Sequence, residues 1–196
     1  MKEILFFGDS NTYGYTEPNE ARFGEDIRWT GRLAKALGRD FQVIEAGLNG
    51  RAAGPYRDLL PERDGLSVIN WYLDRYPNLS AVVVMLGTND VGYAPLCDVM
   101  ANVRQLLQRI LTHPRVVANR AKVILVTPVP MDKNADPHQH SHQLAGIYRA
   151  LSEELGVVNV DAGRWGIELI FDGCHISEEG QRVFARAMEK FIRATV

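Results

Sequence analysis

The sequence of 196 residues has little cysteine, little net charge and no long apolar run, and each shortage excludes a class of protein. Only two cysteines occur, Cys97 and Cys174, so a framework of disulfides cannot hold the chain together. The formal net charge is −2 with both signs dispersed, which gives no electrostatic case for binding nucleic acid or an anionic membrane. No apolar run reaches the length of a transmembrane helix.

The N-terminus also lacks the features of a signal peptide, because the apolar run at 4–7 is short and Asp9 follows it closely. We therefore expect a cytoplasmic protein. Hydrophobic residues make up 46% of the 196 positions, which is enough for a sizeable core. A single domain spanning residues 1–196 is expected.

Short apolar runs alternate with amphipathic stretches along the chain. Strands are expected near 3–7, 41–46, 81–86, 122–127 and 157–160, and helices near 28–37, 67–76, 98–112, 140–155 and 177–194. Because parallel strands need crossover helices, this alternation predicts an α/β fold, a three-layer α/β/α sandwich around a mostly parallel five-stranded sheet. Long connections at 11–26, 47–66 and 128–139 all follow strands, so they should meet at one end of the sheet, where functional loops gather.

Residues 8–10 read Gly-Asp-Ser and follow the first expected strand. Ser10 thus falls in a turn at the carboxyl end of a strand, the place where open α/β sheets hold reactive groups. There its hydroxyl can act as a nucleophile, and its own N–H can face the same pocket. The alternative is that Ser10 merely caps the following helical turn.

Residues 87–90 read Gly-Thr-Asn-Asp and follow the β-branched run at 81–86, which is typical of a central parallel strand. Asn89 therefore lies at the carboxyl end of another strand. Its side-chain amide is a neutral donor that can stabilise an oxyanion. For Asp90 we expect only a role in a turn or cap.

Residues 172–175 read Asp-Gly-Cys-His and precede an amphipathic stretch. A turn can bring the Asp172 carboxylate to one ring nitrogen of His175, fixing the tautomer while the other nitrogen faces Ser10. Asp161, at the end of the last strand, is a rival acid, but Asp172 has the better local reach. A nucleophile, an amide donor, a base and its orienting acid are the parts of an acyl-transfer site.

The motifs and their order resemble those of the SGNH hydrolases of the GDSL esterase family. The matching serine, glycine, asparagine and Asp-x-x-His blocks are residues 8–14, 46–51, 87–90 and 172–175. The resemblance covers nearly the whole chain and is closest to the bacterial arylesterase and acyltransferase branch, which shares the patterns at 27–33 and 85–90. It implies the flavodoxin-like SGNH hydrolase fold.

The resemblance also implies a function. The chain would be a serine esterase, a carboxylic ester hydrolase acting on small esters, acetyl esters above all, with acyl transfer to alcohols as a further activity. Ser10 would be the nucleophile, His175 the base and Asp172 its acid, and the oxyanion would lie among the Ser10 N–H, the Gly50 N–H and the Asn89 amide. No metal or organic cofactor is required, and the relatives imply a homo-oligomer.

Two departures from this branch concern specificity and assembly. The stretch at 128–142 is shorter than its counterpart, which in the relatives helps to build the oligomer and covers the site. The branch usually has an apolar residue after the nucleophile, where this chain has Asn11. We expect the Asn11 side chain to lie near the acyl group and, being polar, to favour acetyl over longer esters. Tyr13, Cys174 and Ile176 are further residues expected at the pocket wall, although Cys174 also suits a role as a small buried side chain.

Other functions fit parts of the pattern. A carbohydrate O-deacetylase, a lysophospholipase or a thioesterase would use the same site. A flavodoxin-like phosphate- or nucleotide-binding protein would explain residues 10–12 as a phosphate-cradling loop but would leave Asp172 and His175 unexplained. The alternating histidines at 138–142 have no partner cluster nearby, so no metal site is expected there. Trp29 is expected to pack in the core rather than to form a substrate platform.

Overall fold

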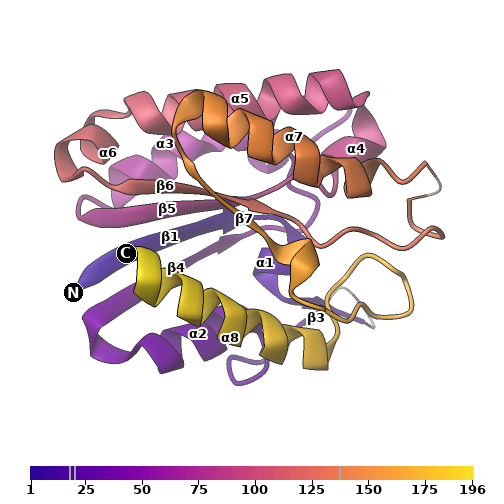
Figure 1. Cartoon of the computed structure of the whole chain (residues 1–196), viewed down its shortest axis with the longest axis horizontal. Helices are drawn as coiled ribbons and strands as arrows, with labels where there is room; N and C mark the ends of the chain where they lie inside the picture. Colours follow the sequence, from indigo (N-terminus) through magenta and orange to yellow (C-terminus); the bar gives the residue numbers. More distant parts are fainter. Residues whose placement is uncertain (18, 20, 137) are drawn as a thin grey trace.

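The centre of the molecule is a five-stranded sheet (Figure 1). In this computed structural model, which describes residues 1–17, 19, 21–136 and 138–196, its strands are β1 (Lys2–Gly8), β4 (Phe41–Gly47), β5 (Leu79–Met85), β6 (Lys122–Thr127) and β7 (Val158–Asp161). Their order is β4-β1-β5-β6-β7, and every neighbouring pair is parallel. The predicted α/β fold with a central parallel sheet is confirmed.

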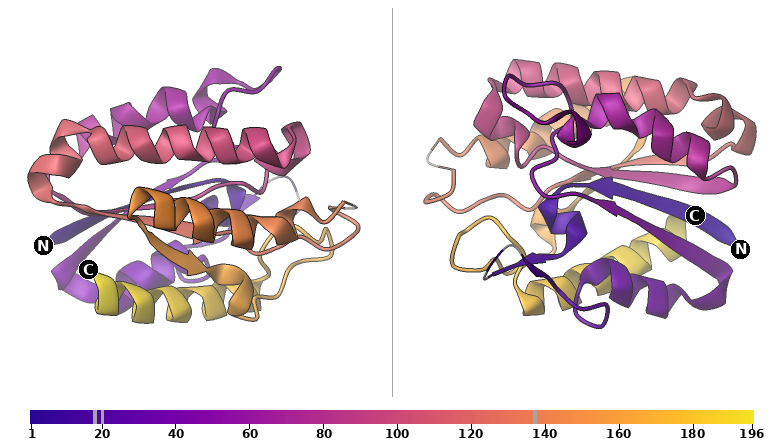
Figure 2. Two further views of the ribbon diagram at one scale, coloured as in Figure 1. Left: turned by 45° about the horizontal axis from the view of Figure 1, so that its top comes forward. Right: turned by 180° about the vertical axis from the view of Figure 1, so that it is seen from behind.

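Helices cover both faces of the sheet (Figures 1 and 2). One layer holds α3 (Gly65–Arg75), α5 (Leu96–Thr112), α6 (Pro114–Asn119) and α7 (His140–Leu155), and the other holds α2 (Trp29–Leu37) and α8 (Glu178–Thr195). Strand β1 shows why both faces need cover. Leu5 and Phe7 point into the core beneath α3, α5 and α7, whereas Ile4 and Phe6 point into the core beneath α2 and α8. A strand with apolar side chains on both faces is stable only between two helical layers.

The predicted strands and long helices agree with the observed bounds to within two residues. Several short elements were not predicted, because they are too short to show a period in the sequence. They are α1 (Ser10–Tyr13), α4 (Asp90–Tyr93), α6, a hairpin of β2 (Tyr15–Thr16) and β3 (Ala21–Arg22), and the 3₁₀ turns η1 (Gly38–Asp40), η2 (Pro61–Arg63) and η3 (Ala162–Arg164).

The strand register brings three of the functional loops together. Gly8 at the end of β1 pairs with Gly47 on β4 and with Met85 on β5, so the segments that follow these strands start side by side. The long connections extend from this end of the sheet, at the right of Figure 1. Residues 18, 20 and 137 of these connections lie outside the described part of the chain. Among the described residues, no helix is long and apolar enough to cross a membrane.

Candidate active site

Ser10 lies at the very start of the short helix α1, directly after β1. Asp9 is the N-cap, and its Oδ1 accepts the N–H of Asn11 at 2.9 Å. The capping role that we considered for Ser10 is thus taken by Asp9, which leaves the serine hydroxyl available for other partners. Gly8 makes the sharp entry possible, because a Cβ there would lie 2.1 Å from the Thr12 hydroxyl and 2.8 Å from the main-chain oxygen of Met85.

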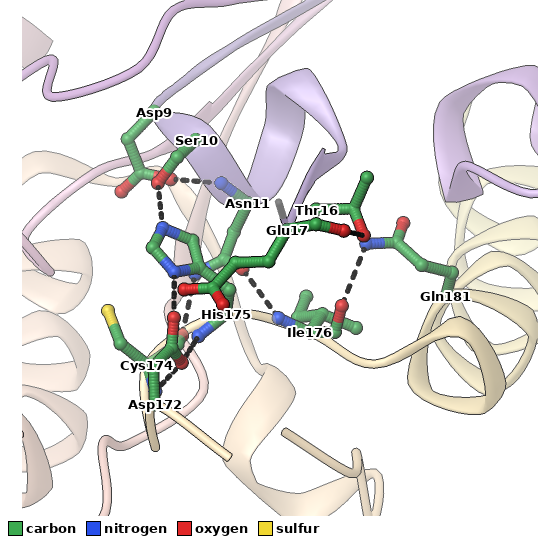
Figure 3. A network of polar contacts seen from close by, with 10 residues as sticks. All are labelled: Asp9, Ser10, Asn11, Thr16, Glu17, Asp172, Cys174, His175, Ile176 and Gln181. Atoms are coloured by element: carbon green, nitrogen blue, oxygen red, sulfur yellow. Dashed lines mark hydrogen bonds and ion pairs between the residues drawn. The ribbon is translucent and has the colours of Figure 1, made fainter. Parts of the chain in front are cut away.

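His175 connects the serine to a carboxylate. Its Nε2 lies 2.9 Å from the Ser10 Oγ, and its Nδ1 lies 2.6 Å from the Asp172 Oδ2 (Figure 3). The other carboxylate oxygen of Asp172 accepts the N–H groups of Cys174 and His175 at 2.8 and 2.9 Å. Ser10 is 5% exposed, and the side chain of His175 is 19% exposed. Ser10, His175 and Asp172 thus form one continuous chain of hydrogen bonds that is partly accessible to solvent.

The environment of Asp172 keeps it ionised. Burial alone would raise the pKa of this carboxyl, but the hydrogen bonds from the His175 ring and from two main-chain N–H groups outweigh burial and lower the pKa below its ordinary value. A carboxylate at Nδ1 holds the imidazole in the tautomer whose Nε2 can accept a proton. The rival acid Asp161 instead accepts the N–H of Gly163 at 3.0 Å and caps η3. The geometry therefore joins His175 to Asp172.

The two segments expected to supply oxyanion donors adjoin each other. Asn89 Nδ2 donates to the carbonyl of Arg51 at 2.9 Å, and Arg51 directly follows Gly50, whose backbone is left-handed with φ of 71°. The buried Arg51 guanidinium donates to the carbonyl of Gly8 at 3.1 Å and to that of Ala46. It thereby ties the ends of β1 and β4 together. Because an amide nitrogen carries two hydrogens, Asn89 retains a second one for a substrate.

Asp90 has a larger structural role than the predicted turn or cap. It is completely buried, and its Oδ1 accepts the N–H of Ala53 at 2.9 Å and the hydroxyl of Tyr56 at 2.8 Å. Burial raises the pKa of Asp90 to about 6. The carboxyl group therefore anchors the 47–66 connection to the segment that carries Asn89.

A hollow of about 480 Å³ opens beside these residues. Its lining consists of the polar or charged residues Thr88, Asn89, Tyr93, Asp136, His138 and His140, together with Val91, Gly92, Met131, Ala135 and Cys174. Burial raises the pKa of the Cys174 thiol to about 12, so this thiol stays protonated and is no competing nucleophile. The hollow thus combines hydrogen-bonding groups with an apolar surface of comparable extent.

Of the four residues expected at the pocket wall, Cys174 lines the hollow and the other three do not. Cys174 lines the hollow, whereas Ile176 is fully buried in the core beneath α2 and α8. The guanidinium of Arg22 lies over the Tyr13 ring, 4.7 Å from the ring centroid. The Asn11 side chain is 4% exposed, and both ends of its amide are hydrogen-bonded to the main chain on either side of His175.

Two aromatic side chains near this end of the sheet, Tyr15 and Trp29, have different surroundings. Tyr15 stacks on the His175 ring with centroids 4.0 Å apart and planes 28° apart. This contact has no periodic signal in the sequence, because Tyr15 lies in the two-residue strand β2 within a long connection. Trp29 is 1% exposed and packs against Phe6 and Phe184, which confirms its expected role in the core.

The alternating histidines of the 128–142 stretch do not converge. The rings of His138 and His140 stack with centroids 5.5 Å apart at the rim of the hollow, while Nε2 of His142 lies 3.1 Å from the carbonyl of Met131. In the part of the chain that the structure describes, no group of three or more histidine, cysteine, aspartate or glutamate side chains is arranged to hold a metal ion.

Comparison with known proteins identifies the family. The profile of the GDSL-like lipase/acylhydrolase family matches residues 6–183. The chain belongs to this family. This GDSL-family member is 25% identical to a GDSL esterase/lipase of Arabidopsis thaliana, with 98% of this chain and 86% of the plant protein covered.

Solved structures of GDSL-family relatives agree with this assignment. An aryl esterase of M. smegmatis is 32% identical with a TM-score of 0.90, and a carbohydrate acetylesterase from Sinorhizobium meliloti is 26% identical with a TM-score of 0.90. Each comparison covers 100% of both chains. The predicted family and enzyme class are confirmed: the GDSL-family chain is a carboxylic ester hydrolase with the SGNH hydrolase fold.

Proposed function

We propose that the chain hydrolyses small carboxylic esters through an acyl-enzyme on Ser10. The observation that carries this proposal is the unbroken chain of hydrogen bonds, 2.6 and 2.9 Å long, from Asp172 through His175 to Ser10. His175 Nε2 takes the hydroxyl proton as Oγ attacks the ester carbonyl, and the Asp172 carboxylate stabilises the resulting imidazolium. The tetrahedral intermediate then releases the alcohol, which leaves with that proton. Water attacks the acyl-enzyme with His175 again as base, and the carboxylic acid departs.

The negative oxygen of the tetrahedral intermediate needs donors that are already in place. We assign this role to the N–H groups of Ser10 and Gly50 and to the second Nδ2 hydrogen of Asn89. The bond from Asn89 to the Arg51 carbonyl supports the assignment, because it fixes the amide next to the Gly50 segment. A fixed donor requires no reorganisation as charge develops, and one such donor is worth about 10²–10³ in kcat.

For the substrate we propose acetyl esters of hydroxyl-rich alcohols. The polar side chains in the lining of the 480 Å³ hollow, Asn89, Asp136, His138 and His140 among them, support this choice, since hydroxyl groups need hydrogen-bond partners when they leave water. The similarity to the S. meliloti carbohydrate acetylesterase points the same way. Small aryl esters are the second candidate, supported by the similarity to the M. smegmatis aryl esterase. An alcohol that competes with water for the acyl-enzyme would receive the acyl group, which is the acyltransferase activity implied by the resemblance.

A panel of esters tests this function. Hydrolysis of p-nitrophenyl acetate, butyrate and octanoate and of mono-O-acetylated monosaccharides is measured for the parent and for Ser10→Ala. We expect acetyl esters to give the highest kcat/KM and the folded Ser10→Ala variant to be inactive on all of them. Parental turnover by a folded Ser10→Ala variant would refute the assignment of the nucleophile, and a preference for octanoate would refute the substrate.

The proposed assembly rests on the family resemblance alone, and the proposed location rests on the sequence expectation given above. We propose a homo-oligomer that resides in the cytoplasm. Light scattering on the purified full chain, and fractionation of cells that express it, test these two statements independently of the chemistry.

A further inference from the structure

The carboxamide of Asn11 is hydrogen-bonded to the main chain on both sides of His175. Its Nδ2 donates to the carbonyl of Cys174 at 3.2 Å, and its Oδ1 accepts the N–H of Ile176 at 3.0 Å (Figure 3). Asn11 is 4% exposed, so its carboxamide is largely shielded from bulk water. The amide therefore pairs with the histidine segment much as a neighbouring strand would, giving one donor and one acceptor.

The main chain of Asn11 is itself held on two sides. Its N–H donates to Asp9 Oδ1 at 2.9 Å, and its carbonyl accepts the indole N–H of Trp29 at 2.8 Å. Ser10 directly precedes Asn11 in α1. A fixed Asn11 therefore sets the position of the histidine segment relative to the helix that carries the serine.

A second bridge reaches the same segment from α8. Gln181 is fully buried, its Oε1 accepts the main-chain N–H of Trp29 at 2.8 Å, and its Nε2 donates to the carbonyl of Ile176 at 3.4 Å. Because Trp29 also binds Asn11, the four residues close a ring of hydrogen bonds. This ring joins α1, the start of α2, α8 and the segment before α8.

We propose that Asn11 is a positioning residue of the esterase site. Its carboxamide couples the helix of Ser10 to the segment of His175 and so maintains the 2.9 Å separation between Oγ and Nε2. This role rests on the proposed functions of Ser10 and His175. Leucine at position 11 would leave the Cys174 carbonyl and the Ile176 N–H buried without partners, and aspartate would keep only the bond to Ile176.

The positioning role proposed for Asn11 and the pocket-wall role expected from the sequence predict different kinetics. A residue at the wall of the acyl pocket changes the ratio of kcat/KM between long and short acyl esters. A positioning residue lowers kcat by one factor for every ester, because a displaced base impairs each acyl transfer equally.

Kinetics of Asn11→Leu and Asn11→Asp, with active sites counted by titration with a p-nitrophenyl phosphonate, test the proposal. In Asn11→Leu we expect kcat for acetyl, butyryl and octanoyl p-nitrophenyl esters to fall about 10- to 100-fold, with KM nearly constant and the chain-length profile unchanged. The kcat of Asn11→Asp should lie between that of Asn11→Leu and that of the parent, since aspartate keeps one of the two hydrogen bonds.

Asn159→Leu is the matched control. Asn159 on β7 also donates its Nδ2 to a main-chain carbonyl, that of Leu125 at 3.0 Å, but within the pairing of β6 and β7. We expect this variant to lose stability while each titrated site keeps the parental kcat. A comparable loss of kcat in Asn159→Leu would show that any weakening of the fold suffices, and would overturn the specific role of Asn11.

Parental kcat per site in Asn11→Leu, or a shifted chain-length profile, would also overturn the proposal. If Asn11→Leu does not fold, parental kcat in Asn11→Asp decides against it. An unreactive parent, or a Ser10→Ala variant with parental activity, would refute the proposed function instead. An active parent with an inert Ser10→Ala variant and unimpaired Asn11 variants would refute the positioning role alone.

Discussion

Hydrogen bonds from neighbouring residues set the partners of Ser10 and Asp172. Asp9 takes the capping role at α1 and frees the Ser10 hydroxyl, while Asp172 receives three hydrogen bonds from the segment that it orients. Spacing predicted the pairing of Asp172 with His175, because a carboxylate three positions before a histidine can reach it within one turn. Spacing did not predict the bonds of Asn11, which join atoms 163 and 165 positions apart.

Removal of the Asn89 amide tests the oxyanion donor at this scale. Asn89→Ala should lower kcat about 10²–10³-fold with little change in KM, because an oxyanion donor acts mainly in the transition state. Steady-state kinetics on p-nitrophenyl acetate measure both constants. A loss confined to KM would assign Asn89 to substrate binding.

The acid of the triad is tested by a pair of matched substitutions. Asp172→Asn should lower kcat by several orders of magnitude, since an amide at Nδ1 favours the tautomer that cannot accept the serine proton. Asp161→Asn changes only the side chain that accepts the Gly163 N–H at 3.0 Å, so its kcat should stay close to the parental value. The assignment is wrong if the change at 161 proves the more damaging one.

At the scale of elements, the carboxyl ends of β1, β4 and β5 supply the segments of the site. The long helices and the strands were predictable because their apolar periods extend over many residues. The helix α1 and the hairpin of β2 and β3 were not, since two to four residues carry no period and depend on tertiary contacts such as Tyr15 on His175. The buried carboxyl groups of Asp9 and Asp90, which lie just after β1 and β5, make the stability of the fold depend on pH.

Burial raises the pKa of Asp9 from 3.8 to about 7, partly offset by the bond from the Asn11 N–H. Between these values the folded protein holds a proton that the unfolded chain has released. The contribution of Asp9 to stability is therefore complete below about pH 4 and is lost as the pH rises through about 7. Asp90, with its pKa raised to about 6, acts in the same direction.

Asp9→Asn should remove this dependence, because the amide keeps an acceptor for the Asn11 N–H and cannot ionise. The Tm of the variant relative to the parent should rise between pH 5 and pH 8 by several degrees, given about 2–4 °C per kcal/mol for a domain of this size. Thermal unfolding monitored by circular dichroism at both values supplies the comparison. A Tm difference that is the same at both would mean that Asp9 is already ionised in the folded state at pH 5.

At the scale of the whole molecule, the Ser10–His175–Asp172 chain adjoins a hollow of mixed polar and apolar lining, formed by residues from separate connections. The sequence predicted that the long connections would converge, but not which side chains would line a cavity, because that depends on the path of each loop. If the hollow receives the alcohol of the substrate, His140→Ala should raise KM for mono-O-acetylated sugars severalfold and leave p-nitrophenyl acetate hydrolysis nearly unchanged. Equal effects on both substrates would place the alcohol elsewhere.

The central claim is that Ser10, activated by His175 and Asp172, forms a covalent acyl-enzyme. The most direct measurement is the reaction of the 196-residue chain with a p-nitrophenyl phosphonate, followed by peptide mass spectrometry. We predict one adduct per chain, located on Ser10, formed in parallel with the loss of esterase activity and absent from His175→Ala over the same interval. An inactivated enzyme with its adduct on another residue, or full activity with Ser10 modified, would contradict the account.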